Sequence, residues 1–411
     1  MGLTSLSFAG VLLTLSAVGR GPPNTWDPLL WLLLIGFVQA TTLGFSLHLF
    51  PSISRRVLPG RILDPLPPAL LTGCIGLGTF SLAEPGLGVP FSTSFAVASV
   101  LLGAAVGIEL ARFVVALRRP VLQTSGPSHR PGDVVSLPLF LLAWASPLAA
   151  SALFFLSACS NGPGFGWWIA GVHLFVLGHA TLLVAAVSLR MVPRSVAADP
   201  PRFLVGAIAA SGAVGSILVP LGMLAPGWLG MLTLPILAAP EGLFAALLAL
   251  SLVILGVRAK TPRPQLGLHL TGVVILLVGG GIGLWMVSTS NYMPYQTHAA
   301  LNVLGFLGLT ILIMWFGMIA PFQRVSHEWT RKMLWTMSVA WVASVACLAA
   351  GWVDLGRISS IALLIGGILL LGTSVSWCIG TLPVLYPSLN PLPGVRLEKI
   401  REAQGRWSGR K

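Results

Sequence analysis

The sequence predicts an all-α integral membrane protein with twelve transmembrane helices. Three observations lead to this prediction. The chain is 55% hydrophobic and only 9% charged, whereas soluble globular domains carry about 25% charged residues. Twelve apolar stretches are each close to the length of about 20 residues that crosses a ~30 Å hydrocarbon core. One sequence motif also recurs in every fourth stretch, which indicates three repeats of four helices.

The twelve stretches follow one another at short intervals along the chain. The first lacks the positively charged start and the clear cleavage site of a secretion signal, so we interpret it as a membrane helix. The longest are expected to tilt or to project beyond the bilayer. The expected spans are 3–19, 28–50, 66–83, 91–117, 134–158, 166–192, 203–225, 229–257, 266–288, 294–320, 333–352 and 358–382.

The recurring motif begins with glycine and ends with proline in the second, sixth and tenth stretches. Its copies run from Gly36 to Pro51, from Gly178 to Pro193 and from Gly305 to Pro321, with separations of 15, 15 and 16 residues. We therefore expect one membrane domain, 1–385, with repeats near 1–125, 126–262 and 263–385, followed by a basic tail, 386–411. Small residues in the motif, including Gly44, favour close helix packing.

The basic residues indicate how the chain is oriented. If the N-terminus is inside, the expected inner segments hold 22 of the 24 Lys and Arg residues. This is the positive-inside pattern, so we expect a multi-pass cell-membrane protein with both termini in the cytoplasm. The net charge of +13 therefore reflects orientation and does not indicate a nucleic-acid partner. The four scattered cysteines predict neither a disulfide framework nor a zinc site.

Two histidines in the outer halves of motif helices are the strongest site candidates, because ionisable groups at membrane depth are costly and usually functional. His173 lies in the sixth stretch and His298 in the tenth, with Asn302 at i+4 on the face of His298. Imidazole suits iron, copper and zinc. His179 lies about 120° from His173 on an α-helix, so we assign it to packing or hydrogen bonding.

The remaining histidines have structural interpretations. His48 and His269 lie near the expected inner ends of their helices and are expected at the interface. His129 and His327 lie in inner loops among arginines and are expected to be solvated.

Glu241 is the one carboxylate expected near mid-membrane, in the eighth stretch after Pro240. Desolvation disfavours its charge, so we expect it to be protonated. It is either part of a proton path or a neutral acid bonded to backbone that the prolines free. Glu109 and Arg112, at the inner end of the fourth stretch, are expected to form a local ion pair.

The pattern resembles the main subunit of haem–copper oxidases, and more closely their degenerate relatives, the NnrS-like membrane haem proteins. The strings HLFVLGHATLLVAAVSLRMVP at 173–193 and THAALNVLGFLGLTI at 297–311 carry the resemblance. By this resemblance, His173 corresponds to a copper-binding histidine and His298 to the start of a haem-binding element.

The chain departs from that pattern at several ligand positions. Ala300 stands where a second histidine of the tenth helix would be, and Trp31 stands at the place that aligns with His173. The seventh stretch has no histidine, although the oxidases place a pair there for copper. Two of six expected ligands remain, so a complete copper site is not expected. We expect instead a haem or a single metal ion held by His173, His298 and Asn302.

The resemblance implies respiratory electron transfer or the handling of nitric oxide or oxygen, with a redox partner or other membrane subunits beside the lipid bilayer. Two alternatives stay open. One is a cofactor-free structural or assembly subunit of a larger membrane complex, consistent with the lost ligands. The other is a secondary transporter, although transporter repeats are usually two and often inverted.

Overall fold

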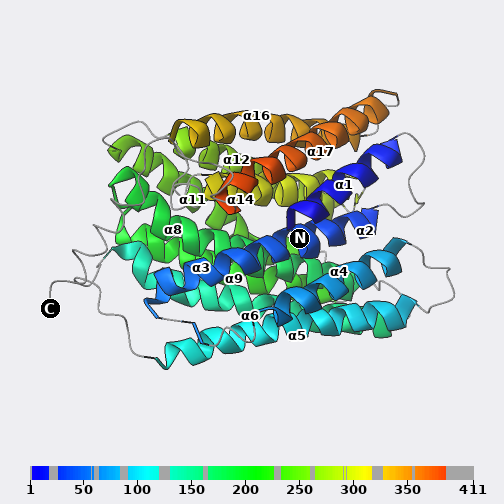
Figure 1. Ribbon diagram of the computed structural model, residues 1–411, viewed down its shortest axis with the longest axis horizontal. Coiled ribbons are helices and arrows are strands. Elements are labelled where there is room, and N and C mark those ends of the chain that lie inside the picture. The colour runs from blue at the N-terminus through cyan, green and yellow to red at the C-terminus, as the bar shows by residue number, and fades with distance from the viewer. Residues whose placement is uncertain are drawn as a thin grey trace.

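The protein is a bundle of helices. The computed structural model describes residues 2–17, 26–56, 58–59, 64–83, 91–119, 130–160, 165–225, 233–259, 264–289, 291–292, 294–316, 327–353 and 357–385. Within these ranges, eleven helices are long and apolar enough to cross a membrane. The helices run roughly side by side along the longest axis of the molecule (Figure 1). This is an all-α polytopic membrane protein.

The observed helices begin and end close to the predicted spans, because burial in lipid or protein follows the same apolar runs. The helix α1 has 16 residues and is shorter than a full span. The elements are α1 (Gly2–Ala17), α2 (Trp26–Trp31), η1 (Leu32–Gln39), α3 (Ala40–Ser54), α4 (Leu66–Ala83), α5 (Phe91–Leu117), α6 (Pro131–Cys159), α7 (Phe165–His173), η3 (Leu174–Thr181), α8 (Leu182–Val196), α9 (Arg202–Leu224), α11 (Ala239–Arg258), α12 (Pro264–Thr289), α13 (Tyr295–Ala299), η4 (Ala300–Gly308), α14 (Leu309–Met314), α16 (His327–Gly351) and α17 (Arg357–Leu385).

The three helices that carry the motif lie at the centre of the bundle. The spans Trp26–Leu47, Gly166–Val196 and Tyr295–Met314 are 83%, 89% and 83% buried, whereas the other eight are 28–50% buried. Because apolar composition is similar in all of these spans, the buried share is what separates central helices from helices at the lipid boundary. The segments η1, η3 and η4 contact one another. We call the three spans Trp26–Leu47, Gly166–Val196 and Tyr295–Met314 the central helices.

Each central helix contains a π-helical segment at its motif glycine, a feature the sequence did not predict. Gly36 lies in η1, Gly178 in η3 and Gly305 in η4. A Cβ added at Gly36 would lie 2.6 Å from Ser5, and one at Gly178 would lie 2.6 Å from Ser146. At Gly305 an added Cβ would lie 2.4 Å from Ile275 of α12. In each predicted repeat, the motif glycine therefore lies against the first helix of that repeat.

Two expectations about the helices were wrong. Gly44 has open space around it, with no atom within 4 Å of an added Cβ, so it does not bring two backbones together. The eighth stretch is not one continuous α-helix, since a turn at Ala238 precedes α11. Glu241 therefore lies in the first turn of α11. The tail 386–411 and His129 lie outside the described residues, as do the side chains of His48 and His327.

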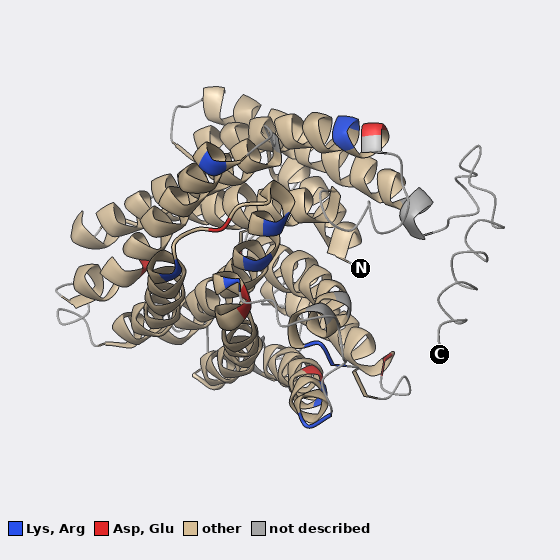
Figure 2. Cartoon of the chain, turned by 90° about the vertical axis from the view of Figure 1, so that its left-hand side faces the viewer, with Lys and Arg blue, Asp and Glu red and all other residues tan. Residues whose placement is uncertain are grey.

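Charged residues gather at one end of the bundle, which faces the viewer in Figure 2. We call it the charged end; it holds the C-termini of α3, α5, α8 and α11 and the N-termini of α6, α9 and α16. Asp133 binds Arg194 and Arg190 there, at 2.6 and 3.1 Å. The expected pair of Arg112 with Glu109 is present at 2.7 Å, and Asp64 joins it.

Candidate functional site

The structure brings His173 and His298 together at the end of the bundle opposite the charged end. His173 is the last residue of α7, and His298 lies in the short helix α13. Their ring centres are 6.1 Å apart, and the ring planes differ by 21°. Both side chains are partly buried. Two central helices from different predicted repeats therefore contribute one imidazole each to a common place.

Backbone carbonyls set the tautomer of both rings. The Nδ1 atom of His173 lies 2.8 Å from the carbonyl oxygen of Ile169, and that of His298 lies 2.7 Å from the carbonyl oxygen of Gly279. A carbonyl oxygen can only accept a hydrogen bond, so each Nδ1 carries the proton. Each Nε2 then keeps its lone pair. No described protein group bonds to either Nε2 atom. This is the arrangement in which a histidine is prepared to bind a metal.

Asn302 adds a third polar group beside the pair. Its amide nitrogen donates to the backbone carbonyl of His298 at 2.8 Å. Its Oδ1 is buried and has no hydrogen-bond partner within the described chain. Two glycines of α12 leave room for these side chains. An added Cβ at Gly279 would lie 2.8 Å from the Asn302 amide, and one at Gly283 would lie 2.5 Å from the His298 ring. A buried acceptor without a partner costs about 1–3 kcal/mol, which a bound cation or donor would offset.

Of the polar residues that the sequence places near His298, Asn302 alone approaches its ring, with the amide nitrogen 3.3 Å from Nδ1. Thr297 donates to the carbonyl of Ala349, and Gln296 donates to the hydroxyl of Tyr295, so neither contacts the imidazole. The shorter contact of the His298 ring, at 2.7 Å, is to the backbone carbonyl of Gly279 on another helix. Backbone groups leave no residue signature, so the sequence could not have indicated it.

His179 belongs to a separate buried contact. Its Nδ1 lies 2.7 Å from the carbonyl oxygen of Ala143, and its Nε2 lies 3.0 Å from the hydroxyl of Thr42. Both ring nitrogens are therefore used within the protein, in the hydrogen-bonding role the sequence suggested. The angle of 120° from His173 assumed an α-helix, but the π-helical segment η3 lies between the two residues and has a wider turn.

Aromatic side chains fill the place that would hold a ligand on the second helix. Trp31 is fully buried, and its ring lies 5.2 Å from Phe95, 5.4 Å from Phe154 and 6.1 Å from Trp168. Its indole nitrogen donates to the carbonyl of Cys74 at 3.4 Å. The cluster makes this position part of the core rather than part of a cofactor site.

Glu241 does not join the histidine pair as a third ligand. Its carboxylate faces α9, where a Cβ added at Gly215 would lie 2.7 Å from Oε2. The Oε1 atom is buried and has no partner among the described residues, so the expected bond to free backbone groups is not present for this oxygen.

His269 lies near the start of α12, and its side chain is buried against neighbouring helices. Only 9% of its surface is exposed, and it lines a cavity of about 10 Å³ together with Ser188 and Thr310. A cavity of this size holds about one water molecule, provided that polar partners surround it. The three polar side chains meet that condition.

The residues at the histidine pair fit a metal ion better than a haem. Two imidazoles that share one ion through bonds of about 2.0 Å have ring centres up to roughly 6 Å apart, so the observed 6.1 Å lies at the upper end of that range. Pockets for cofactor-sized ligands measure roughly 300–1,000 Å³. Two cavities between the described helices measure about 30 and 10 Å³, and neither of these two is lined by His173 or His298. In the described part of the chain, no third His, Cys, Asp or Glu completes a ligand set.

Comparison with known proteins adds no family to this description. No protein-family model matches the chain, and no curated protein matches it either. The resemblance to haem–copper oxidases therefore remains a prediction from the motif strings, and the function has to be argued from the site.

Proposed function

We propose that this chain is a haem–copper-oxidase-like membrane protein that holds one transition-metal ion with His173 and His298. The ion would lie near the outer face and serve respiratory electron transfer or the handling of nitric oxide or oxygen. One observation carries the proposal: each imidazole donates its Nδ1 proton to a backbone carbonyl, which leaves the lone pair of its Nε2 available, and the two ring centres are 6.1 Å apart. Iron, copper and zinc suit such ligands.

The site would leave most positions around the ion open. His173 and His298 supply two ligands, and the unpartnered Oδ1 of Asn302 is the nearest further donor. Fewer than three protein ligands is less than a structural zinc site requires. A bound ion with open positions can take a small molecule from outside or exchange one electron. The protein's part is to orient the two rings and to exclude bulk water.

We also infer that the charged end is cytoplasmic and that both termini lie there in the cell membrane. The support is the concentration of Lys and Arg at that end, which follows the positive-inside rule. A cysteine placed in the tail should then be labelled by an impermeant maleimide only after the cells are opened.

Metal analysis of the purified protein tests the proposal. Wild-type protein from cells supplied with iron, copper and zinc should carry about one ion per chain. His173→Ala and His298→Ala should each lose it, whereas His269→Ala, which alters another buried histidine, should keep it. No metal in the wild-type protein, or equal metal in all four, would remove the proposal. An absorption spectrum on the same samples would reveal haem through its Soret band.

A cofactor-free subunit of a larger membrane complex is the second candidate. The aromatic packing around Trp31 supports it, because that position is built as core. A protein without metal that co-purifies with other membrane subunits would favour this candidate. The transporter alternative rests on the turn at Ala238 and on the Glu241 oxygen that has no partner among the described residues. It predicts that Glu241→Gln abolishes the transport of a substrate.

A further inference from the structure

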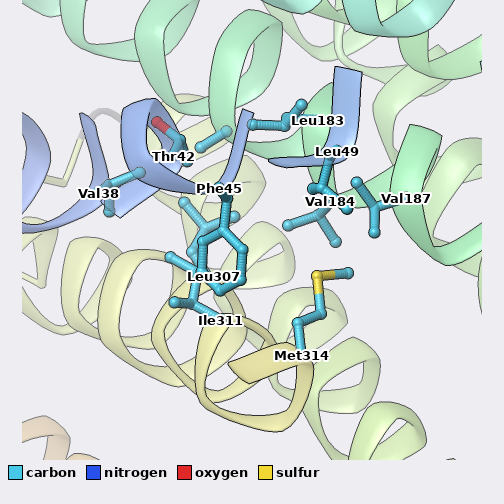
Figure 3. Close-up of a pocket in the computed structure, with 11 residues that line it drawn as sticks. Val38, Thr42, Phe45, Leu49, Leu183, Val184, Val187, Leu307, Ile311 and Met314 are labelled. Carbon is cyan, nitrogen blue, oxygen red and sulfur yellow. The ribbon is translucent and has the colours of Figure 1, made fainter. Parts of the chain in front are cut away.

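A second feature of the central helices is a cavity on the side of the charged end. It measures about 30 Å³ and lies where α3, η3 with α8, and η4 with α14 come together. Figure 3 shows its wall, with Phe45 from the first central helix, Val184 from the second, and Leu307 and Met314 from the third. Each predicted repeat therefore contributes to one space between the central helices.

The wall of the cavity offers no polar atom. Among the lining residues only Thr42 has a polar side chain. Its hydroxyl donates to the carbonyl of Gln39 at 3.0 Å and lies 3.0 Å from Nε2 of His179. In Figure 3 this oxygen points away from the other lining side chains. A buried water needs two to four polar partners, and apolar cavities without them stay dry. The cavity is therefore unsuited to water.

The size of the cavity selects small molecules. One water-sized sphere needs about 10–15 Å³, so a space of about 30 Å³ is suited to a diatomic molecule and far too small for an organic ligand. Wall atoms around a void lack contacts on one side, and a nonpolar occupant restores the dispersion attraction that they miss.

We propose that this cavity binds one small apolar gas molecule of the class of dioxygen and nitric oxide. It lies on the same central helices as the histidine pair, since Ala180 of its wall follows His173 by seven residues of the second central helix. The gas site goes beyond the proposed metal site and does not depend on it. If the proposed function holds, the cavity stores the gas within the same bundle.

Xenon is a suitable probe, because it is an inert apolar atom of similar size. The experiment measures saturable xenon binding by ¹²⁹Xe exchange NMR on chelator-treated protein in nanodiscs, with empty nanodiscs as the reference. Ala180→Val places two methyl groups in the cavity and should weaken xenon binding at least about tenfold, because the added groups occupy the space. Ala210→Val, the same change at an exposed position of α9, should bind xenon as the wild type does.

Ile311→Val gives an independent test in the opposite direction. It removes one methylene from the wall, so it should keep xenon binding or strengthen it. Absence of saturable binding in the wild type, or equal binding in Ala180→Val and Ala210→Val, overturns the proposal. If Ala180→Val fails to fold, loss of xenon binding in folded Ile311→Val overturns it. Since no metal is present, these results are independent of the metal analysis.

Discussion

Gly305→Ala is the sharpest test of how the central helices pack. In the structure an added Cβ would lie 2.4 Å from Cγ2 of Ile275 and 3.3 Å from Cγ1 of Val345, whereas ordinary contact begins at 3.4 Å. Ile275 is β-branched and has one strongly preferred rotamer in a helix, so it cannot easily turn aside. The neighbouring helix α12 has to move outward by about 1 Å to admit the methyl group.

The expected magnitude combines two opposing terms. Overpacking a well-packed interior costs about 1–3 kcal/mol, and replacing glycine with alanine within a helix regains up to about 1 kcal/mol. Gly305→Ala should therefore lower the free energy of unfolding by about 0–3 kcal/mol. Gly44→Ala meets nothing within 4 Å, so it should raise that free energy by up to about 1 kcal/mol. The two variants should differ by about 1–3 kcal/mol.

Thermal unfolding of both variants in one detergent measures this difference. The melting temperature of Gly305→Ala should fall below that of Gly44→Ala. Adding Ile275→Ala to Gly305→Ala should restore part of the loss, since it removes the side chain that the new methyl group meets. Equal melting temperatures of the two glycine variants would refute the close approach of η4 to α12.

Two further predictions concern buried polar contacts. Asp133→Asn removes the carboxylate that binds Arg190, a side chain only 8% exposed, so it should cost about 3–5 kcal/mol of stability. The matched change Glu328→Gln breaks a pair exposed by about 70% on both sides and should cost less than about 1 kcal/mol in the same unfolding assay. Trp144→Phe removes a 3.0 Å hydrogen bond from the indole to the hydroxyl of Ser46 and should cost about 1–3 kcal/mol. Ser46→Ala introduced together with it should recover part of that cost in a double-mutant cycle, and independent effects would argue against the bond.

The helices were predictable because their signal is local. An apolar run of about 20 residues has few alternatives in a bilayer, since every backbone polar group must be satisfied within the helix. The span 91–117 matches α5 at both ends, and the span 66–83 matches α4. The eighth stretch was the exception. Its prolines interrupt the helix at Ala238 without interrupting the apolar run, so hydropathy did not register the turn.

The candidate site was predictable only in its residue types. His173 and His298 were found because an imidazole at membrane depth is unusual and because the motif places both in central helices. Their distance, their tautomers and their carbonyl partners depend on how α7, α12 and α13 lie against one another. Gly279 shows why, since its contribution to the site is a backbone oxygen that any residue would possess.

The amino-acid sequence by itself determined the class of protein, the approximate helix ends and the separation of charge to one end, because these depend on short-range composition. Only the tertiary structure decided which helices are central, that Trp31 is core, that Gly44 has no neighbouring atom within 4 Å of an added Cβ, and that the three central helices line one apolar cavity. The physical reason is that packing joins residues more than a hundred positions apart. Contacts of that kind, such as His173 with His298, have no local trace in the chain.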